Sequence, residues 1–293
     1  MRLERLDTPD GDRVHLYHRD VARDRPRVFL LHGLEGSVRS HYVQGFVQGA
    51  EERGWNTTLL VFRGCGPELN AAPRMYHSGE TTDLRWALAE VARRNPDQSV
   101  GLAGVSLGGN VLLKFLGEDG GAVPRQVQAA AAVSVPYDLE AGARHLQQGF
   151  ARVYDRHFLK SLRRKAILKL VQHPGLFSRD RLLAARTIED FDDAVTGPVH
   201  GFSGSNEYYT KSSSIHFLDR IEIPTLLVSS EDDPFLPAQV LAKVRQVATG
   251  NRHLTVEFSS AGGHVGFLAG NIPFRPVHWA EQRVLSFFDT FLK

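Results

Sequence analysis

The segment SVGLAGVSLGGNVLLKFLG, residues 99–117, decides the fold. Its first half is a short apolar run, typical of a buried strand, and its second half has the composition of a helix. Between them, residues 104–108 read Gly-Val-Ser-Leu-Gly and match the G-x-S-x-G pattern, which places a serine on a sharp strand-to-helix turn. An ordinary glycine-rich turn is the alternative, but the strand and helix on either side favour a nucleophilic role for Ser106.

A serine alcohol is a weak nucleophile at neutral pH, so it needs a base, an exposed position and stabilisation of the developing anion. The helix that begins at Leu107 directs free N–H groups toward that anion. An oxyanion hole requires two backbone donors. We expect them from Leu107 and from Leu34, which lies in the loop His-Gly-Leu-Glu-Gly-Ser at 32–37.

Strand-like and helix-like segments alternate over most of the chain. The first twenty residues alternate in polarity around a Pro-Asp-Gly turn and predict an antiparallel hairpin. Further strands are expected at 27–33, 56–64, 99–106, 127–136, 224–230 and 253–260. Helices are expected at 41–53 and 81–94, and from Pro237 and Pro276. This order predicts a single α/β domain over residues 1–293, with a mostly parallel eight-stranded sheet flanked by helices.

One connection is much longer than the usual loop of roughly 2–6 residues. It joins the strands at 127–136 and 224–230, and its stretch 141–171 is helical in composition. We therefore expect a helical cap at 137–220, inserted between strands 6 and 7. Its segment 151–170 is basic and amphipathic, which is compatible with a solvated face or with contact to an anionic membrane.

The base must be chosen among thirteen histidines by position. Ligands meet the carboxyl ends of the strands in an open parallel sheet. His264 lies in a glycine-rich loop just after the last strand, at that end, whereas His253 begins the same strand and His278 is expected inside the final helix. His32 closes an earlier strand, where bracing of its loop is the simpler role. His264 is therefore the expected base.

The acid is expected after the seventh strand, in Glu-Asp-Asp-Pro at 231–234. A carboxylate there can reach the far nitrogen of the base and fix its tautomer. Asp233 directly precedes proline and is preferred over Asp232, while Asp138 after the sixth strand is a third candidate. The alternative for each is helix capping or turn formation. With Asp233, the chain order is serine, aspartate, histidine.

Composition excludes several classes of protein. The net charge of +2 and the lack of a basic block beside aromatic residues indicate no nucleic-acid partner. A single cysteine forms no internal disulfide, and neither a metal nor a cofactor is expected. The charged N-terminus does not resemble a signal peptide, and no run of about 18 apolar residues predicts a spanning helix. We expect a cytoplasmic protein without an integral membrane segment.

Together these residues resemble the YheT-like branch of the α/β-hydrolases, also called the AB hydrolase 4 family. The matching segments cover nearly the whole chain: LLHGLEGS (30–37), FRGCG (62–66), YHSGETTDL (76–84), GVSLGGN (104–110), EDDPFLP (231–237) and GGHVGF (262–267). The resemblance implies an α/β-hydrolase fold, a triad of Ser106, Asp233 and His264, and hydrolase or carboxylesterase activity. Relatives in animals act on lipid esters, including phospholipids.

The expected function is hydrolysis of a small-molecule carboxylic ester, a lipid-like one included, through an acyl-enzyme. Thioester or lactone hydrolysis is possible with the same residues. A homologue that binds a ligand without turnover is the alternative from another class. Epoxide and haloalkane hydrolysis are disfavoured, because those reactions use an aspartate where Ser106 stands.

Overall fold

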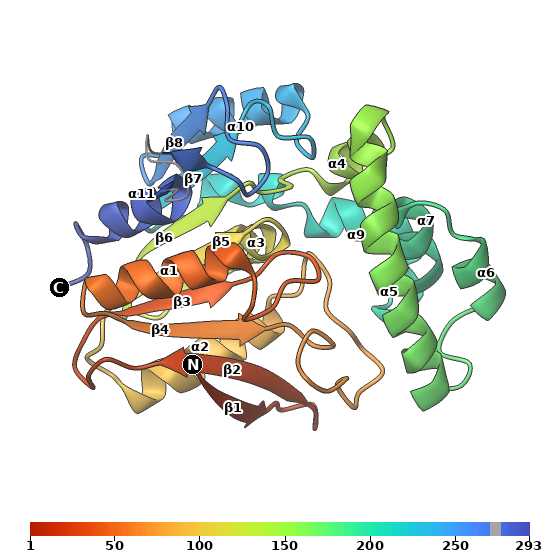
Figure 1. Cartoon of the computed structure of the whole chain (residues 1–293), viewed down its shortest axis with the longest axis horizontal. Helices are drawn as coiled ribbons and strands as arrows, with labels where there is room; N and C mark the ends of the chain where they lie inside the picture. The colour runs from red at the N-terminus through yellow and green to blue at the C-terminus, as the bar shows by residue number, and fades with distance from the viewer. Residues whose placement is uncertain (270–276) are drawn as a thin grey trace.

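An eight-stranded sheet runs through the centre of the molecule in this computed structural model, which describes residues 1–269 and 277–293 (Figure 1). The strand order is β1-β2-β4-β3-β5-β6-β7-β8; β1 and β2 pair antiparallel, β2 is antiparallel to β4, and the remaining pairs are parallel. The strands are β1 (Arg2–Asp7), β2 (Arg13–Arg19), β3 (Arg27–Leu31), β4 (Asn56–Val61), β5 (Val100–Val105), β6 (Val127–Val133), β7 (Thr225–Ser230) and β8 (Leu254–Ser259). The predicted fold class and the N-terminal hairpin are confirmed.

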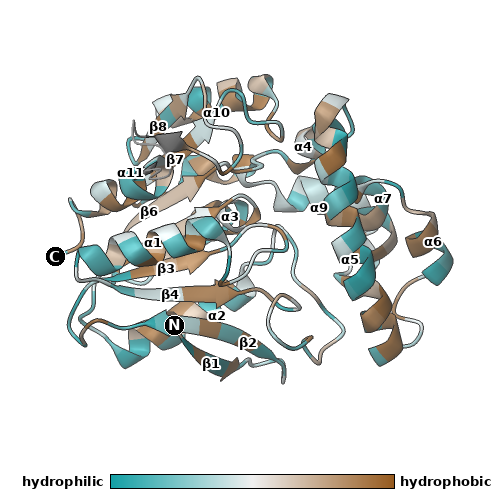
Figure 2. Cartoon of the chain, viewed as in Figure 1, coloured by the Kyte–Doolittle hydropathy of each residue, from teal (hydrophilic) through white to brown (hydrophobic). Residues whose placement is uncertain are grey.

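The central strands are buried on both faces, which explains why their sequences are apolar runs without alternation. Every residue of β3, β4, β5 and β7 is buried. Figure 2 shows β3 in brown along its length, whereas helix α1 beside it alternates between teal and brown. The helices therefore present one apolar side to the sheet and one polar side to solvent.

Two layers of helices cover the sheet. Helices α1 (His41–Glu52) and α11 (Trp279–Phe288) share one apolar core with one face of the sheet. The other face packs against α2 (Thr82–Arg94), α3 (Leu107–Asp119) and α10 (Ala238–Gly250). The predicted helix starts agree closely with these bounds, except that Pro276 lies outside the described residues. A short pair of strands, β9 (Leu268–Ala269) and β10 (Val277–His278), precedes α11 and was not predicted, so His278 lies before that helix and not inside it.

Helical segments fill the connection between β6 and β7. They are α4 (Leu139–Leu146), α5 (Arg152–Gln172), α6 (Arg179–Ala184), α7 (Ile188–Phe191), α8 (Gly197–Val199) and α9 (Ser205–Ser212), with the π-helical turn η3 (Asp192–Thr196) between α7 and α8 and short 3₁₀ turns elsewhere. α5, α6 and η3 contribute to an apolar cluster of their own, separate from the cores on the sheet. Figure 1 shows α5 standing beside the sheet, beyond the ends of β3 and β4. Treating 137–220 as a cap stays a prediction. Within the described residues, no helix has the length and apolar character needed to cross a bilayer.

Candidate active site

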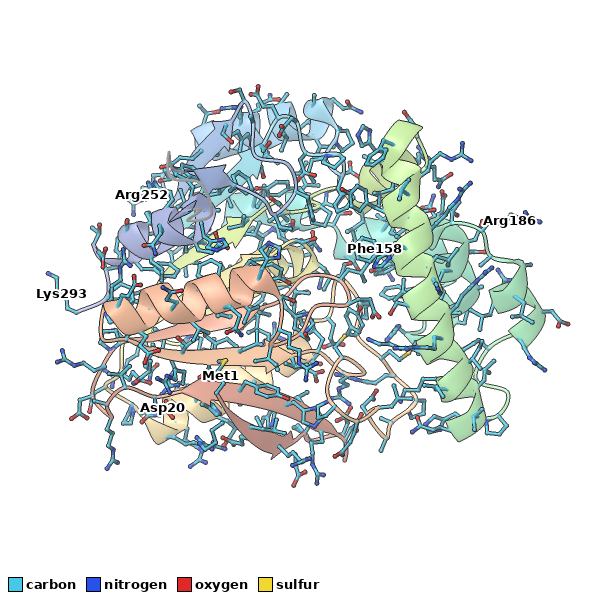
Figure 3. All side chains as sticks on the ribbon, in the orientation of Figure 1. Met1, Asp20, Phe158, Arg186, Arg252 and Lys293 are labelled. Atoms are coloured by element: carbon cyan, nitrogen blue, oxygen red, sulfur yellow. The ribbon has the colours of Figure 1, made fainter. Side chains whose placement is uncertain are left out.

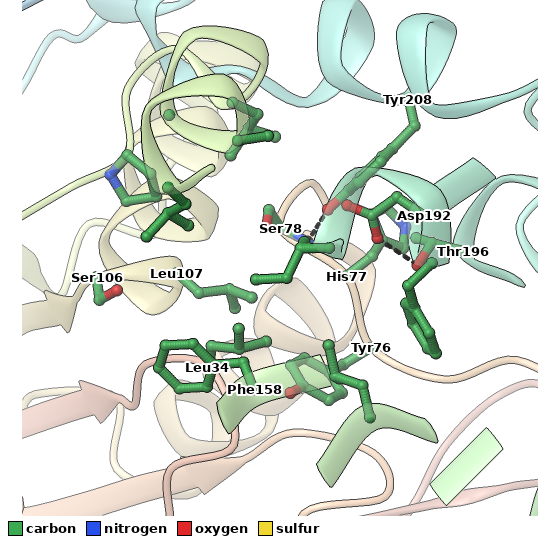
Figure 4. Close-up of a pocket in the computed structure, with 18 of the residues that line it drawn as sticks. Leu34, Tyr76, His77, Ser78, Ser106, Leu107, Phe158, Asp192, Thr196 and Tyr208 are labelled. Atoms are coloured by element: carbon green, nitrogen blue, oxygen red, sulfur yellow. Dashed lines mark hydrogen bonds between the residues drawn. The ribbon is translucent and has the colours of Figure 1, made fainter. Parts of the chain in front are cut away.

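Ser106 occupies a strained turn between β5 and α3. Its backbone has φ 55° and ψ −122°, a conformation that costs a non-glycine residue about 1–3 kcal/mol and that clusters at functional sites. The flanking residues must be glycines, because a side chain at either position would collide with the backbone. A Cβ on Gly104 would lie 2.5 Å from the carbonyl oxygen of Gly108, and a Cβ on Gly108 would lie 2.5 Å from that of His32. The turn therefore holds the Ser106 hydroxyl at the edge of a cavity (Figure 4).

His264 lies against Ser106, although 158 residues separate them. Its Nε2 is 2.9 Å from the Ser106 Oγ, and its Nδ1 is 2.8 Å and 3.1 Å from the two carboxylate oxygens of Asp233. The side chain of Asp233 is fully buried. A buried carboxylate bonded to Nδ1 favours the tautomer whose Nε2 is free to accept the serine proton.

The other two candidate acids are engaged elsewhere. Asp232 Oδ1 accepts hydrogen bonds from the N–H groups of Gly262 (3.0 Å) and Gly263 (2.8 Å), so it holds the loop that carries the histidine. Asp138 caps α4 by accepting the N–H of Ala141 at 3.0 Å. The structure therefore brings only Asp233 of the three to the imidazole.

The loop after β3 places Leu34 beside Ser106 and Leu107 in the cavity wall. Within the part of the chain that the structure describes, the backbone N–H groups of Leu34 and Leu107 donate to no acceptor. His32 braces this loop, because its Nδ1 donates to the Gly33 carbonyl (2.7 Å) and its Nε2 accepts the Phe62 N–H (3.1 Å). Burial lowers the pKa of His32 to about 4, so the ring is neutral near pH 7, as both bonds require.

Glu35, the next residue of the loop, joins it to α5. Its backbone has φ 57°, and its N–H donates to the hydroxyl of Tyr76 at 3.0 Å. Its carboxylate accepts from the Tyr76 hydroxyl (2.7 Å), from the Lys165 ammonium (2.7 Å) and from Ser161. Burial would raise the pKa of Glu35, but these partners, Lys165 first, lower it below its usual value. An ion pair thus fixes α5 against the loop that contains Leu34.

The cavity beyond Ser106 has an empty volume of about 1110 Å³, part of it open to solvent. Its wall near the serine is largely apolar and includes Leu34, Leu107, Leu139, Leu146, Phe158, Leu162 and Phe235. Polar residues lie on the side of the cavity opposite Ser106 (Figure 4). There, Asp192 accepts a hydrogen bond from the Thr196 hydroxyl (2.6 Å), and the Tyr208 hydroxyl accepts one from the Ser78 N–H (2.9 Å). Burial raises the pKa of Asp192 to about 7. The cavity can therefore hold a mainly apolar molecule with its reacting carbon at Ser106.

Several residues of the site carried no recognisable signal in the sequence. Phe235 packs its ring 4.0 Å from the ring of His264, yet it follows the candidate acids as an ordinary apolar residue. Lys165 and Asp192 reach the site from α5 and η3, and no local sequence pattern predicts where these helices lie relative to the sheet. Two residues of the YHSGETTDL segment have separate roles: His77 lines the cavity, and Glu80 accepts the Thr82 N–H at the start of α2 (2.7 Å).

Among the described residues, no group of three or more metal-ligating side chains occurs.

Comparison with known proteins places this chain in a family. Residues 26–270 match the family described as alpha/beta hydrolase fold. YheT from Escherichia coli (strain K12) is 38% identical over 99% of this chain and 85% of its own length. Phospholipase ABHD3 from Homo sapiens is 30% identical over 93% of this chain and 68% of its own length. The esterase Pf2001 from Pyrococcus furiosus has a similar fold, with a TM-score of 0.66 at 17% identity over 100% of this chain and 90% of its own. The chain therefore belongs to the α/β-hydrolase fold family, in the branch that contains YheT.

Proposed function

We propose that this protein hydrolyses carboxylic esters through an acyl-enzyme formed on Ser106. The observation that carries the proposal is the position of the His264 imidazole, with one nitrogen 2.9 Å from the Ser106 hydroxyl and the other 2.8 Å from the Asp233 carboxylate. Such an arrangement activates an alcohol that is otherwise a poor nucleophile. The triad and its chemistry are our inference from that geometry.

In the first half-reaction the Ser106 Oγ attacks the ester carbonyl carbon while its proton passes to Nε2 of His264. The carbonyl oxygen becomes an oxyanion, which accepts hydrogen bonds from the N–H groups of Leu34 and Leu107. When this intermediate collapses, the bond to the alcohol oxygen breaks, and the alcohol leaves with the proton from Nε2. Asp233 stabilises the imidazolium that exists between the two proton transfers.

In the second half-reaction a water molecule attacks the acyl carbon while His264 accepts one of its protons. The bond to Ser106 Oγ breaks, that proton returns to the serine oxygen, and the carboxylic acid is released. One ester and one water thus give one acid and one alcohol, with the enzyme regenerated.

The choice of esters rests on two considerations. Some of the relatives are named as enzymes of lipid esters: phospholipase ABHD3 from Homo sapiens and monoacylglycerol lipase ABHD2 from Danio rerio are two of them. The cavity wall beside Ser106 is largely apolar, which suits an acyl chain better than a charged group. We take residues 137–220 as the cap that sets chain length, because Phe158 and Leu162 of α5 lie in that wall.

The test is hydrolysis of p-nitrophenyl esters from acetate to palmitate by the wild type, by Ser106→Ala and by Ser286→Ala. Ser286 is an exposed serine on α11 and serves as the matched control. We expect activity in the wild type and in Ser286→Ala, and its loss in Ser106→Ala. Equal hydrolysis by wild type and Ser106→Ala would instead favour a ligand-binding protein without turnover.

A further inference from the structure

The longest helix of the protein, α5 (Arg152–Gln172), is strongly basic. Seven of its 21 residues are arginine or lysine. Three of these contact the rest of the protein: Lys165 pairs with Glu35, and Arg163 and Lys169 donate to backbone carbonyl groups of neighbouring segments. These contacts fix which side of α5 faces the protein and which side faces solvent.

The other four cations form a stripe on the solvent side: Arg152, Arg156, Lys160 and Arg164. They are spaced four residues apart, so they follow one another along a single side of the helix. All four are exposed, and none forms an ion pair with a carboxylate among residues 1–269 and 277–293. The single acidic residue of α5, Asp155, is buried and accepts the N–H of Ile188 at 3.0 Å. The outward charge of this helix is therefore not compensated along its length.

Exposed apolar side chains lie between and beyond these cations. Six of the nine large apolar residues that are exposed among the described part of the chain belong to 149–172: Phe150, Val153, Tyr154, Ile167, Leu168 and Val171. Phe150 and Val171, near the two ends of the helix, are 73% and 75% exposed. We call the surface formed by these six residues and the four cations the outer face of α5. Figure 2 shows teal and brown mixed along this helix, and Figure 3 shows blue-tipped side chains around it.

We propose that the outer face of α5 binds the surface of an anionic lipid bilayer. Cations between aliphatic side chains suit a bilayer, where the cations meet phosphate groups while the apolar side chains enter the headgroup boundary. A nucleic acid would use the cations but would leave Ile167, Leu168 and Val171 without an apolar partner. The four cations complement the phosphate groups of anionic lipids, and the exposed apolar side chains need an apolar partner, so the two features together favour a lipid surface over a nucleic acid.

The outer face continues into the candidate active site through a chain of aromatic contacts. The ring centroids of Tyr154 and Phe235 are 5.0 Å apart, and those of Phe235 and His264 are 4.0 Å apart. The opposite side of α5 contributes Phe158 to the cavity wall. A bilayer bound to the outer face would therefore lie against the same helix that lines the cavity.

The test is cosedimentation with vesicles of phosphatidylcholine alone and of phosphatidylcholine mixed with phosphatidylglycerol. We expect the wild type to bind the mixed vesicles and not the neutral ones, and to bind less as salt increases. The double variant Lys160→Gln/Arg164→Gln should bind about thirty-fold more weakly, since each cation near an anionic surface contributes about 1 kcal/mol and a tenfold change corresponds to about 1.4 kcal/mol. Leu168→Gln/Val171→Gln should lose about tenfold or more.

The matched control is Arg23→Gln/Arg25→Gln, which changes the net charge equally. Both arginines are exposed and precede β3, whereas α5 contacts the loop that follows β3. This control should bind like the wild type, and all variants should keep the wild-type circular dichroism spectrum and melting temperature. These readouts do not require ester hydrolysis, so the proposal stands or fails independently of the proposed function.

Three results would overturn the proposal. The first is no binding of the wild type to mixed vesicles. The second is an equal loss in both charge-neutralised variants, which would indicate a response to net charge alone. The third is unchanged binding by Leu168→Gln/Val171→Gln together with tighter binding to single-stranded RNA than to vesicles, which would assign the surface to nucleic acid.

Discussion

Replacing Asp233 by asparagine is expected to abolish most of the hydrolytic rate while leaving the fold intact. Asp233 Oδ1 accepts the N–H of Phe235 at 2.8 Å, and Oδ2 lies 2.8 Å from Nδ1 of His264. An asparagine keeps the first bond only if its carbonyl oxygen takes the Oδ1 position. Its NH₂ group then faces Nδ1 and donates to it, so the ring proton moves to Nε2. A protonated Nε2 cannot accept the proton of Ser106.

The magnitude follows from this change of tautomer. In a triad of this type, an aspartate-to-asparagine substitution lowers kcat about 10⁴-fold, as measured in a serine protease, which corresponds to about 5.4 kcal/mol of transition-state stabilisation. The neighbouring carboxylate provides a matched control. Asp232→Asn retains a carbonyl oxygen that can accept the N–H groups of Gly262 and Gly263, so we expect at most about a tenfold loss, the effect of one weakened hydrogen bond.

The assay is the initial rate of p-nitrophenyl ester hydrolysis, with the free energy of unfolding measured in parallel by urea denaturation. Asp233→Asn should lose kcat and retain most of its stability, because its carbonyl oxygen can still accept the Phe235 N–H. Equal losses of kcat in Asp233→Asn and Asp232→Asn would refute the reasoning, and so would a larger loss in Asp232→Asn.

Two further results are expected. Because burial raises the pKa of Asp192 to about 7, the folded state favours its protonated form, and that stabilisation is lost as pH rises toward 7. We therefore compare the free energy of unfolding of the wild type with that of Asp192→Asn by urea titration at several pH values. The difference between them should fall by about 2.7 kcal/mol from pH 5 to 8, whereas a constant difference would exclude this titration. Gly108→Ala should destabilise by about 3 kcal/mol or more in thermal melts, because its Cβ would meet the His32 carbonyl, whereas Gly250→Ala, with nothing within 4 Å, should change stability little.

Much of the fold could be predicted from local patterns, because the strands of a sheet covered on both faces must be apolar throughout. The two apolar segments that end at Leu31 and just before Ser106 illustrate this, since they form β3 and β5 and every residue of both strands is buried. The short strands β9 and β10 could not be predicted, since two residues carry no periodicity.

Some residues of the candidate site could also be predicted from the sequence, and others could not. Ser106 could be predicted because its turn imposes glycines at fixed neighbouring positions, and His264 because parallel strands deliver their following loops to one edge. Asp233 could be preferred over Asp232 because it precedes a proline, but the contacts of the two carboxylates, one with the loop of Gly262 and Gly263 and the other with His264, depend on side-chain directions that no local pattern encodes. Lys165 could not be predicted, because its partner Glu35 lies 130 residues away and nothing local distinguishes it from the other cations of α5.

The measurement that tests the central claim most directly is peptide mapping by mass spectrometry after reaction with a fluorophosphonate. We predict one adduct per chain, on the oxygen of Ser106, that forms at neutral pH in the wild type and far more slowly in His264→Ala. An unlabelled protein, or an adduct on any other residue, would contradict the account.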